Sequence, residues 1–411
     1  MDVQEVLRNL GLILGAGLCA GPIAVLLRVP QMIVLVAVGA LIGPSALGLV
    51  ENPLTGLGAQ LIFTVGVSLI LFHGGTEISL RVLSRTAVGL GLLVLPGVLL
   101  SAVLVALVVA PLFNVAFDVA LLIGAVLAAT DPAILIPLFD RIRLRPKVAQ
   151  TVIAESAFND PTATVLALTL AATVQSGSVT LGGPLGDFTQ SLLIGTAFGI
   201  VAGVAIAVFM SSNRAGIWRE SPAAVVVAVI ALGYFSVDEL GGSGYLAAFV
   251  IGLIVGNMEL LGLGRHDRDA IRLEAFVSQV SEIAVLAVFV TLGMNLPFDQ
   301  LGDHLVRGLV VVAFFMFVVR PLVVLACLLP DRRGSWTRNE LIFLAWCRET
   351  GVVPAAVASL LLARHVAGAE IAVSLVAIAV CVTLLVQATT AGWLAGRLGL
   401  LDAPPAPPDA A

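Results

Sequence analysis

Long apolar runs recur from one end of the chain to the other, with short polar connections between them. A membrane-spanning helix needs about 20 mostly apolar residues. On that criterion the runs begin near residues 6, 30, 58, 83, 117, 149, 188, 222, 243, 276, 305, 339 and 370. Because 59% of the residues are hydrophobic and only 11% are charged, a water-soluble core could not bury them. The sequence therefore predicts an all-α polytopic membrane protein with thirteen transmembrane helices.

The short connections favour one compact unit, so we expect a single transmembrane domain over residues 1–401. Residues 402–411 are rich in proline and alanine and are predicted to form a short disordered tail. The first apolar run is longer than the core of a signal peptide and has no clear cleavage signature. It is interpreted as a retained helix.

The few polar groups argue against several other classes of protein. The net charge of −5 comes from residues scattered between apolar runs, and no basic patch suited to nucleic acid is present. The four cysteines have no paired spacing, which predicts neither a disulfide framework nor a zinc site. We expect no cofactor and no nucleic-acid partner.

Basic residues gather on alternate connections. Of the 21 arginines and lysines, 16 fall on the odd-numbered connections or after the last helix, three fall on the other side, and Arg320 and Arg348 lie inside spans. Arginine and lysine are retained on the cytoplasmic side of a membrane. The sequence therefore predicts a protein of the cell inner (plasma) membrane with its N-terminus outside and its C-terminus in the cytoplasm, as an odd number of helices requires.

The fifth span, GAVLAATDPAILIPLF, places Thr130, Asp131 and Pro132 about halfway through the bilayer. An ionised side chain at that depth costs about 2.5 to 3.5 kcal/mol on insertion scales, so it is a candidate for function. Pro132 removes a backbone donor, and Asp131 before it can cap a new helix. This pattern predicts a helix broken at the membrane midplane.

The twelfth span carries a second interruption, with Arg348 and Glu349 followed by Gly351 and Pro354. If the first six and the last six spans are repeats joined by the seventh, spans five and twelve occupy equivalent positions and the repeats are inverted. Interrupted helices at matching places in inverted repeats are typical of the ion site of a transporter. The predicted fold is therefore two inverted six-helix repeats with broken crossing helices.

The sixth span, AESAFNDPTATV, supplies a third polar element. At 100° per residue, Ser156 and Asp160 share one face of a helix, whereas Glu155 and Asn159 share another. Ser156 and Asp160 could join Asp131 and the Thr130 carbonyl in a hydrated cavity. Those hard oxygen ligands suit Na⁺ or Li⁺.

The other face of the sixth span predicts a supporting polar cluster. We expect Glu155 to pair with Arg348, because a buried anion and a buried cation stabilise each other, and Asn159 to add neutral hydrogen bonds. Glu282 and Arg320 are expected to snorkel or to pair at the membrane interface.

Two further residues are possible accessories to the site. His73 could sense pH, although a hydrogen-bonded packing role is the stronger interpretation. Glu349 could point into the cavity or towards Arg348, and periodicity does not decide between them.

The paired carboxylates suggest a transport mechanism. Desolvation and like charge both favour the protonated form of a carboxylate, so a proton and a cation compete for the same oxygens. Because a neutralised site crosses the apolar barrier most cheaply, this competition predicts exchange of Na⁺ or Li⁺ for H⁺. K⁺/H⁺ exchange is the close alternative, and a sodium-coupled symporter of an organic anion or a channel is a more distant one. No nucleophile is accompanied by a plausible base, so we do not expect an enzyme.

Several motifs carry a resemblance to a known family. The chain resembles the NhaP-type sodium/proton antiporters of the monovalent cation/proton antiporter superfamily. The shared motifs, in chain order, are LFHGGTE, ATDP, ESAFNDP, GSGYLAAFVIGLIVGN, FVTLGMNL and RETGVVPAA.

The resemblance implies a thirteen-helix homodimer that serves pH homeostasis, with core helices at about 83–174 and 303–398 and interface helices at about 6–80 and 188–296. It implies that Asp160, Asp131, Ser156 and Thr130 bind the ion, supported by Glu155, Asn159 and Arg348. Relatives with an aspartate at the position of Asn159 tend to be electrogenic, so electroneutral exchange is expected. Many relatives have a carboxylate where this chain has His73, which weakens any expectation of an ion contact from that helix.

Overall fold

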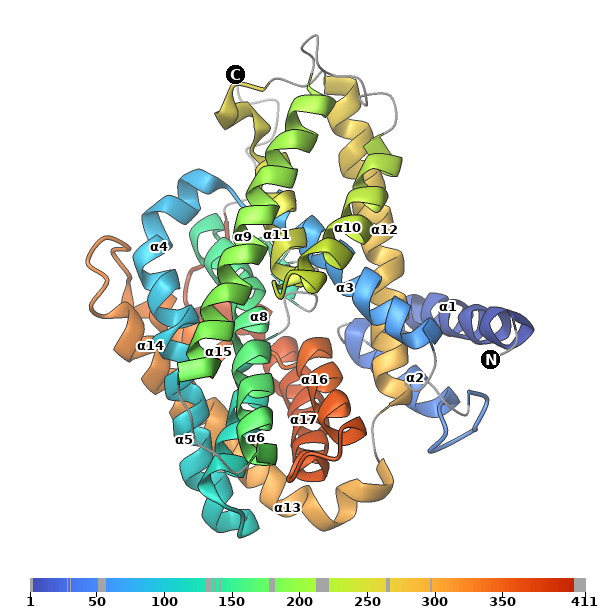
Figure 1. The fold of residues 1–411 in the computed structure, drawn as a ribbon, viewed down its shortest axis with the longest axis vertical. Coiled ribbons are helices and arrows are strands. Elements are labelled where there is room, and N and C mark those ends of the chain that lie inside the picture. Colours follow the sequence, from blue (N-terminus) through green and yellow to red (C-terminus); the bar gives the residue numbers. More distant parts are fainter. Residues whose placement is uncertain are drawn as a thin grey trace.

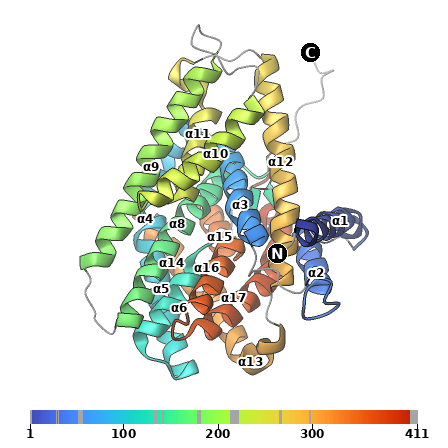
Figure 2. The ribbon, with the colours of Figure 1, turned by 45° about the vertical axis from the view of Figure 1, so that its right-hand side comes forward.

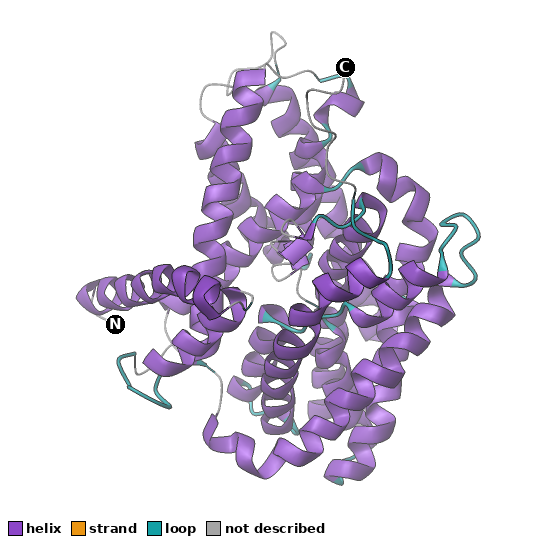
Figure 3. Ribbon diagram, turned by 180° about the vertical axis from the view of Figure 1, so that it is seen from behind, coloured by secondary structure: helices purple, strands orange, loops and turns teal. Residues whose placement is uncertain are grey.

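The computed structural model describes residues 3–27, 29, 31–50, 57–130, 135–136, 138–139, 142–176, 182–211, 222–263, 267–295 and 298–402. Within these ranges every extended regular element is a helix, and one isolated bridge pairs Leu144 with Leu401. Figures 1 and 3 show helices throughout. The predicted all-α class is confirmed for the described residues.

One group of helices packs around α11 and α12. Its members are α1 (Val3–Leu27), α2 (Gln31–Ile42), α3 (Leu57–Glu77), α9 (Gly182–Met210), α10 (Pro222–Glu239), α11 (Gly244–Gly256) and α12 (Asp267–Met294). Helix α11 packs against both α3 and α9, and α12 packs against α2 and α3. Helix α1 extends from the side of the molecule beside α2 and α12 (Figures 1 and 2).

Glycines let the backbones of this first group approach closely. A Cβ on Gly252 of α11 would overlap the carbonyl oxygen of Phe72 in α3, and a Cβ on Gly293 of α12 would overlap that of Val36 in α2. Small residues at membrane helix contacts allow this close packing. The group is therefore held together by backbone contact.

A second group of helices surrounds α8 and contains the helix ends that form the candidate site. Its members are α4 (Leu80–Val94), α5 (Pro96–Phe113), α6 (Phe117–Ala128), α8 (Pro146–Ser176), α13 (Phe298–Phe314), α14 (Arg320–Leu328), α15 (Arg338–Trp346), α16 (Val352–Ala363), α17 (Ala369–Thr383) and α18 (Thr389–Arg397). Helix α6 packs between α5 and α8, and α17 packs against α13 and α16.

Two π-helical turns interrupt this second group. The turn η2 (Phe315–Val319) joins α13 to α14, and η3 (Leu384–Ala388) joins α17 to α18. A π turn shifts the faces of the helix that follows it, and such turns are frequent at functional sites. Both turns lie close to the C-terminal end of α15, at Trp346.

Among the described residues, six helical runs are long and apolar enough to cross a membrane. They are Gln4–Leu27, Thr86–Phe113, Thr189–Met210, Ile271–Met294, His304–Leu328 and Ala369–Arg397. Shorter apolar helices include Phe117–Ala128 and Val353–Leu362, which are half-length pieces beside helix breaks. A multi-pass membrane protein is therefore supported, and the thirteen spans and the inverted repeats stay predictions.

The predicted break in span twelve is present. Helix α15 ends at Trp346, residues 347–351 are not helical, and α16 begins at Val352. In span five, α6 ends at Ala128 and Ala129 is extended, with ψ of 149°. Residues 131–134, on which the other half of that prediction falls, lie outside the described residues.

The linker between α3 and α4 joins the two helix groups. The Asn257 side chain, at the end of α11, accepts a hydrogen bond from the Leu80 amide (3.0 Å) and donates to the Ile78 carbonyl (2.7 Å). From α8, the side-chain oxygen Oε1 of Gln150 accepts a hydrogen bond from the Ser79 amide (3.2 Å). One side chain from each group therefore fixes this linker.

Candidate ion-binding site

Helix α8 carries the four polar residues of the sixth predicted span into the interior. The exposed fractions are 2% for Glu155, 0% for Ser156, 1% for Asn159 and 0% for Asp160. Polar side chains that are removed from both water and lipid need partners or a ligand. The contacts that they make therefore define the site.

Asp160 and Thr130 are neighbours. The backbone amide of Thr130 donates to Asp160 Oδ1 at 3.1 Å, just past the end of α6. The hydroxyl groups of Thr130 and Ser156 are both buried, and neither makes a hydrogen bond to another described residue. Because Ser156 lies one helical turn before Asp160, a carboxylate and two neutral oxygens without partners occur in one region. Oxygen ligands of this kind suit a hard cation.

Asp131 follows Thr130 directly in the chain but lies outside the described residues. Its predicted place opposite Asp160 therefore stays a prediction. The position of Thr130 brings the start of that segment to Asp160.

Glu155 pairs with Arg320. Arg320 Nη1 donates to Glu155 Oε1 at 2.5 Å, and Nη2 donates to Oε2 at 2.9 Å. The predicted pair between Glu155 and Arg348 is therefore wrong. The expectation that Arg320 lies at the membrane interface is also wrong, because its side chain is 2% exposed. A planar guanidinium matches both oxygens of a carboxylate, which makes this a specific contact.

Arg320 also binds the end of α15. Its Nε donates to the Leu344 carbonyl at 3.0 Å, and its Nη2 reaches the Cys347 carbonyl at 3.5 Å. The last carbonyls of a helix have no partner within that helix and carry partial negative charge. Arg320 therefore stabilises the buried carbonyl end of the broken helix.

Arg348 does the same for α6. It donates from Nη2 to the Ala128 carbonyl and from Nη1 to Ser101 Oγ at 3.4 Å, and its guanidinium lies 4.5 Å from the ring centre of Phe315. Two buried arginines therefore occupy the carbonyl ends of two helices that stop inside the protein, which compensates for the partial charge at each break.

Asn159, the remaining residue of the supporting cluster, forms a neutral hydrogen bond of the kind that was predicted for it. Asn159 Nδ2 donates to Glu155 Oε1 at 3.4 Å, one turn along α8. At the start of α8, Lys147 pairs at 2.8 Å with Glu340, which lies in the first turn of α15. Helices α8 and α15 are thus connected near both ends of α15.

Two side chains from the C-terminal helices form hydrogen bonds with the backbone at the break in span twelve, and neither was predicted from the sequence. Gln387 Nε2, in the π turn η3, donates to the Trp346 carbonyl at 2.5 Å, and Thr383 Oγ1 accepts from the Thr350 amide at 3.2 Å. Both side chains are buried in an apolar run. A buried glutamine in such a run is the signal that could have indicated them.

The two accessory candidates lie in different helix groups. Glu349 is fully buried in the break between α15 and α16. His73 is half-buried in α3, and its Nδ1 makes no hydrogen bond to a described residue.

A family profile described as "Sodium/hydrogen exchanger, transmembrane" matches residues 13–396. The chain belongs to this family. This membership confirms the NhaP-type resemblance and the predicted class of sodium/proton exchanger, and the family is one of transporters.

Individual exchangers agree with this assignment. The "K(+)/H(+) antiporter NhaP" of Alkalimonas amylolytica is 29% identical over 79% of this chain, which spans only 55% of the length of that relative. The "Probable Na(+)/H(+) antiporter 2" of Methanocaldococcus jannaschii is 26% identical over 88% of this chain and 85% of its own length. The solved structure of the sodium proton antiporter MjNhaP1 from Methanocaldococcus jannaschii at pH 8 superposes with a TM-score of 0.82. The superposition covers 97% of this exchanger and 99% of the MjNhaP1 chain, and the two sequences are 25% identical.

Proposed function

We propose that this exchanger carries Na⁺ or Li⁺ in one direction and H⁺ in the other, through a mid-membrane site formed by Asp160, Asp131, Ser156 and Thr130. One observation carries the proposal. The fully buried Asp160 carboxylate binds the Thr130 amide at the end of a broken helix, in the region of two buried hydroxyls that make no hydrogen bond to described residues. A cation and a proton each neutralise this carboxylate, so the two compete.

The supporting cluster confines that competition to the aspartates. The bidentate contact with Arg320 occupies both carboxylate oxygens of Glu155, so we assign the transported proton to the aspartates and not to Glu155. Asn159 is neutral at every physiological pH, and we propose that exchange is electroneutral, with one cation moved for one proton. Arg348 acts on the ion site through the carbonyl end of α6.

Alternating access is proposed to come from movement of the core helices (about 83–174 and 303–398) against the interface helices (about 6–80 and 188–296). The packing of the described helices in two groups supports this division. A ring contact of 5.2 Å between Phe158 of α8 and Phe249 of α11 lies between the groups. An apolar contact of this kind can slide without breaking hydrogen bonds.

The proposed exchanger has thirteen spans in two inverted repeats, with its N-terminus outside and its C-terminus in the cytoplasm of the cell membrane. The concentration of basic residues on one set of connections supports this orientation. We propose a homodimer, with the partner on the interface helices. K⁺ is the second candidate cation, because relatives include the K(+)/H(+) antiporter NhaP.

The test is a pH-gradient assay in proteoliposomes, with Na⁺, Li⁺ and K⁺ added in turn to wild type and to Asp160→Asn. We expect Na⁺ and Li⁺ to dissipate the gradient in wild type and no cation to do so in Asp160→Asn, while both proteins elute as the same folded species. Undiminished exchange by Asp160→Asn would remove this carboxylate from the mechanism. An imposed membrane potential tests the stoichiometry, since a rate that follows the potential contradicts electroneutral exchange.

A further inference from the structure

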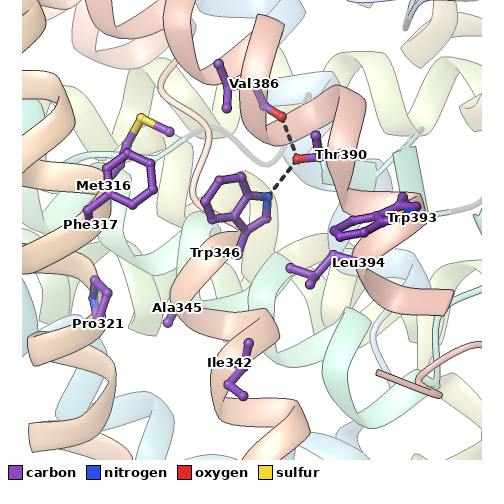
Figure 4. Close-up of a pocket in the computed structure, with 10 residues that line it drawn as sticks. All are labelled: Met316, Phe317, Pro321, Ile342, Ala345, Trp346, Val386, Thr390, Trp393 and Leu394. Atoms are coloured by element: carbon purple, nitrogen blue, oxygen red, sulfur yellow. Dashed lines mark hydrogen bonds between the residues drawn. The ribbon is translucent and has the colours of Figure 1, made fainter. Parts of the chain in front are cut away.

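A cavity of about 530 Å³ lies outside the ion site, against the break in span twelve. It is enclosed by η2 and the start of α14, by the last turns of α15, and by η3 and α18 (Figure 4). Its lining includes Met316, Phe317, Ile342, Trp346, Trp393 and Leu394. Its volume is within the range of about 300 to 1,000 Å³ that is common for small-molecule sites.

The lining of the cavity is almost entirely apolar. Two of its polar side chains are already hydrogen-bonded, because the Trp346 indole donates to Thr390 Oγ1 at 2.9 Å and the Thr390 hydroxyl donates to the Val386 carbonyl at 2.6 Å (Figure 4). Apart from the indole N–H of Trp393, the other lining side chains are apolar. A water molecule in such a site lacks the two to four partners that it needs, so an apolar occupant is favoured.

The cavity opens on a surface that the bilayer would cover. Phe317 is 61% exposed, Ile342 41% and Trp393 63%, and the lining turns belong to the apolar runs His304–Leu328 and Ala369–Arg397. Hydrocarbon chains are the solvent at this surface. An acyl chain therefore has direct access to the cavity.

Positive charge lies at one end of the cavity. The Arg397 guanidinium is 5.3 Å from the ring centre of Trp393, and the exposed Arg397 side chain forms no ion pair with another described residue. Asn339 Nδ2 donates to the Leu398 carbonyl at 3.0 Å, which brings the start of α15, with the exposed Arg338, to the same end. A tryptophan beside basic residues is typical of the level of lipid headgroups.

We propose that this cavity binds an anionic phospholipid, with one acyl chain between η2, α15 and α18 and the phosphate on Arg397. Basic sites between membrane helices recognise such headgroups. The bound chain would contact Trp346, the last residue of α15, whose carbonyl is held by Gln387. The lipid would thus contact the last turns of the broken helix, whose Leu344 carbonyl is bound by Arg320. This site does not depend on which cation the protein exchanges.

The test uses phosphatidylglycerol with a photoreactive diazirine in one acyl chain, added to the purified full chain in detergent. We expect cross-links in the peptides that contain Met316, Trp346 and Trp393, and competition by unlabelled phosphatidylglycerol that is stronger than competition by phosphatidylcholine of the same chain length. Arg397→Gln removes the positive charge of the guanidinium. The affinity for phosphatidylglycerol should then fall about fivefold, because one basic residue near a membrane surface contributes roughly that factor.

Two further variants complete the test, one for the acyl chain of the lipid and one as a control for the arginine substitution. Ala345→Leu extends a side chain from the cavity wall, so it should reduce cross-linking by both lipids. Arg272→Gln removes an exposed arginine from α12, which belongs to the other helix group, and should change nothing. Equal competition by the two lipids, cross-links outside the cavity, or cross-links that join two copies of the chain would each overturn the proposal. All of these experiments measure lipid binding. Their outcome is therefore independent of whether the protein exchanges cations as proposed.

Discussion

The guanidinium of Arg320 binds both carboxylate oxygens of Glu155, at 2.5 and 2.9 Å, and donates to the Leu344 carbonyl at 3.0 Å. Glu155 lies one residue before Ser156 and one turn before Asn159 in α8, and Leu344 lies in the last turn of α15. One side chain therefore fixes the helix that carries Asp160 relative to the broken helix, and the ion site depends on it for its geometry.

Arg320→Met should strongly destabilise the protein. The substitution leaves Glu155 buried without its cation, which costs about 3 to 5 kcal/mol when one partner of a buried pair is removed. Thermal unfolding in detergent measures the effect. Arg272→Gln, an exposed arginine on α12, is the control and should unfold within a degree or two of wild type. An Arg320→Met protein that unfolds at the wild-type temperature would mean that the pair does not form.

Glu155 should couple to Arg320 and only weakly to Arg348. A double-mutant cycle with Glu155→Leu and Arg320→Met should give a coupling energy near the upper end of the range of about 0.5 to 3 kcal/mol that residues in contact show. The parallel cycle with Arg348→Met should give less, because Arg348 binds Ala128 and Ser101. Unfolding free energies in detergent supply both cycles. A larger coupling to Arg348 would reverse this assignment of partners.

The sequence predicted which residues are buried and polar better than it predicted their partners. Charges inside apolar runs are conspicuous, and Gly351 with Pro354 indicated the break after Trp346 correctly. Periodicity relates residues within one helix, so the i to i+4 relationship of Glu155 and Asn159 could be deduced. It does not determine which of two arginines on other helices faces Glu155.

Two features concealed the role of Arg320. The continuous helical run from Phe298 to Leu328 is longer than a perpendicular span requires, so the depth of a residue within it was ambiguous. The π turn at Phe315–Val319 then changes the face on which Arg320 lies, and the sequence carries no strong signal for such a turn. The pairing therefore needed the tertiary structure.

Gly252→Ala should destabilise the contact between α3 and α11. The added methyl group would overlap the Phe72 carbonyl, and a backbone atom in a packed helix cannot move aside without cost, so we expect a loss of about 1 to 3 kcal/mol. Gly91→Ala in α4 is the matched control, since its Cβ would meet no atom within 4 Å. Loss of glycine flexibility should leave that variant neutral or more stable by up to about 1 kcal/mol. Thermal unfolding compares the two, and equal shifts would contradict the close contact.

Asn257→Ala should loosen the linker between the helix groups. The variant loses the hydrogen bonds to the Leu80 amide and the Ile78 carbonyl, so peptides over residues 78–84 should exchange amide hydrogen faster. Hydrogen-exchange mass spectrometry measures this directly. Asn295→Ala, which removes a bond to the Thr291 carbonyl at the end of α12, is the control and should leave the linker unchanged. Unchanged protection of residues 78–84 in Asn257→Ala would show that Gln150 alone holds the linker.

Ser156→Ala should weaken cation binding while the fold stays intact. The Ser156 hydroxyl is fully buried and makes no hydrogen bond to a described residue, so its removal breaks no described contact and leaves no other polar group without a partner. If the hydroxyl ligates the ion beside Asp160, its loss removes one neutral oxygen ligand. A neutral polar contact contributes about 0.5 to 1.5 kcal/mol, so the KM for Na⁺ should rise about 2- to 12-fold. The maximal rate of exchange should remain near that of wild type because the titrating carboxylate is retained.

Thr162→Ala is the matched control, since that hydroxyl, on the same helix, donates to the Phe158 carbonyl at 2.7 Å and has no role in the proposed site. Equal KM values for wild type and Ser156→Ala would exclude the hydroxyl as a ligand, and the ion would then be bound by the carboxylates and Thr130 alone.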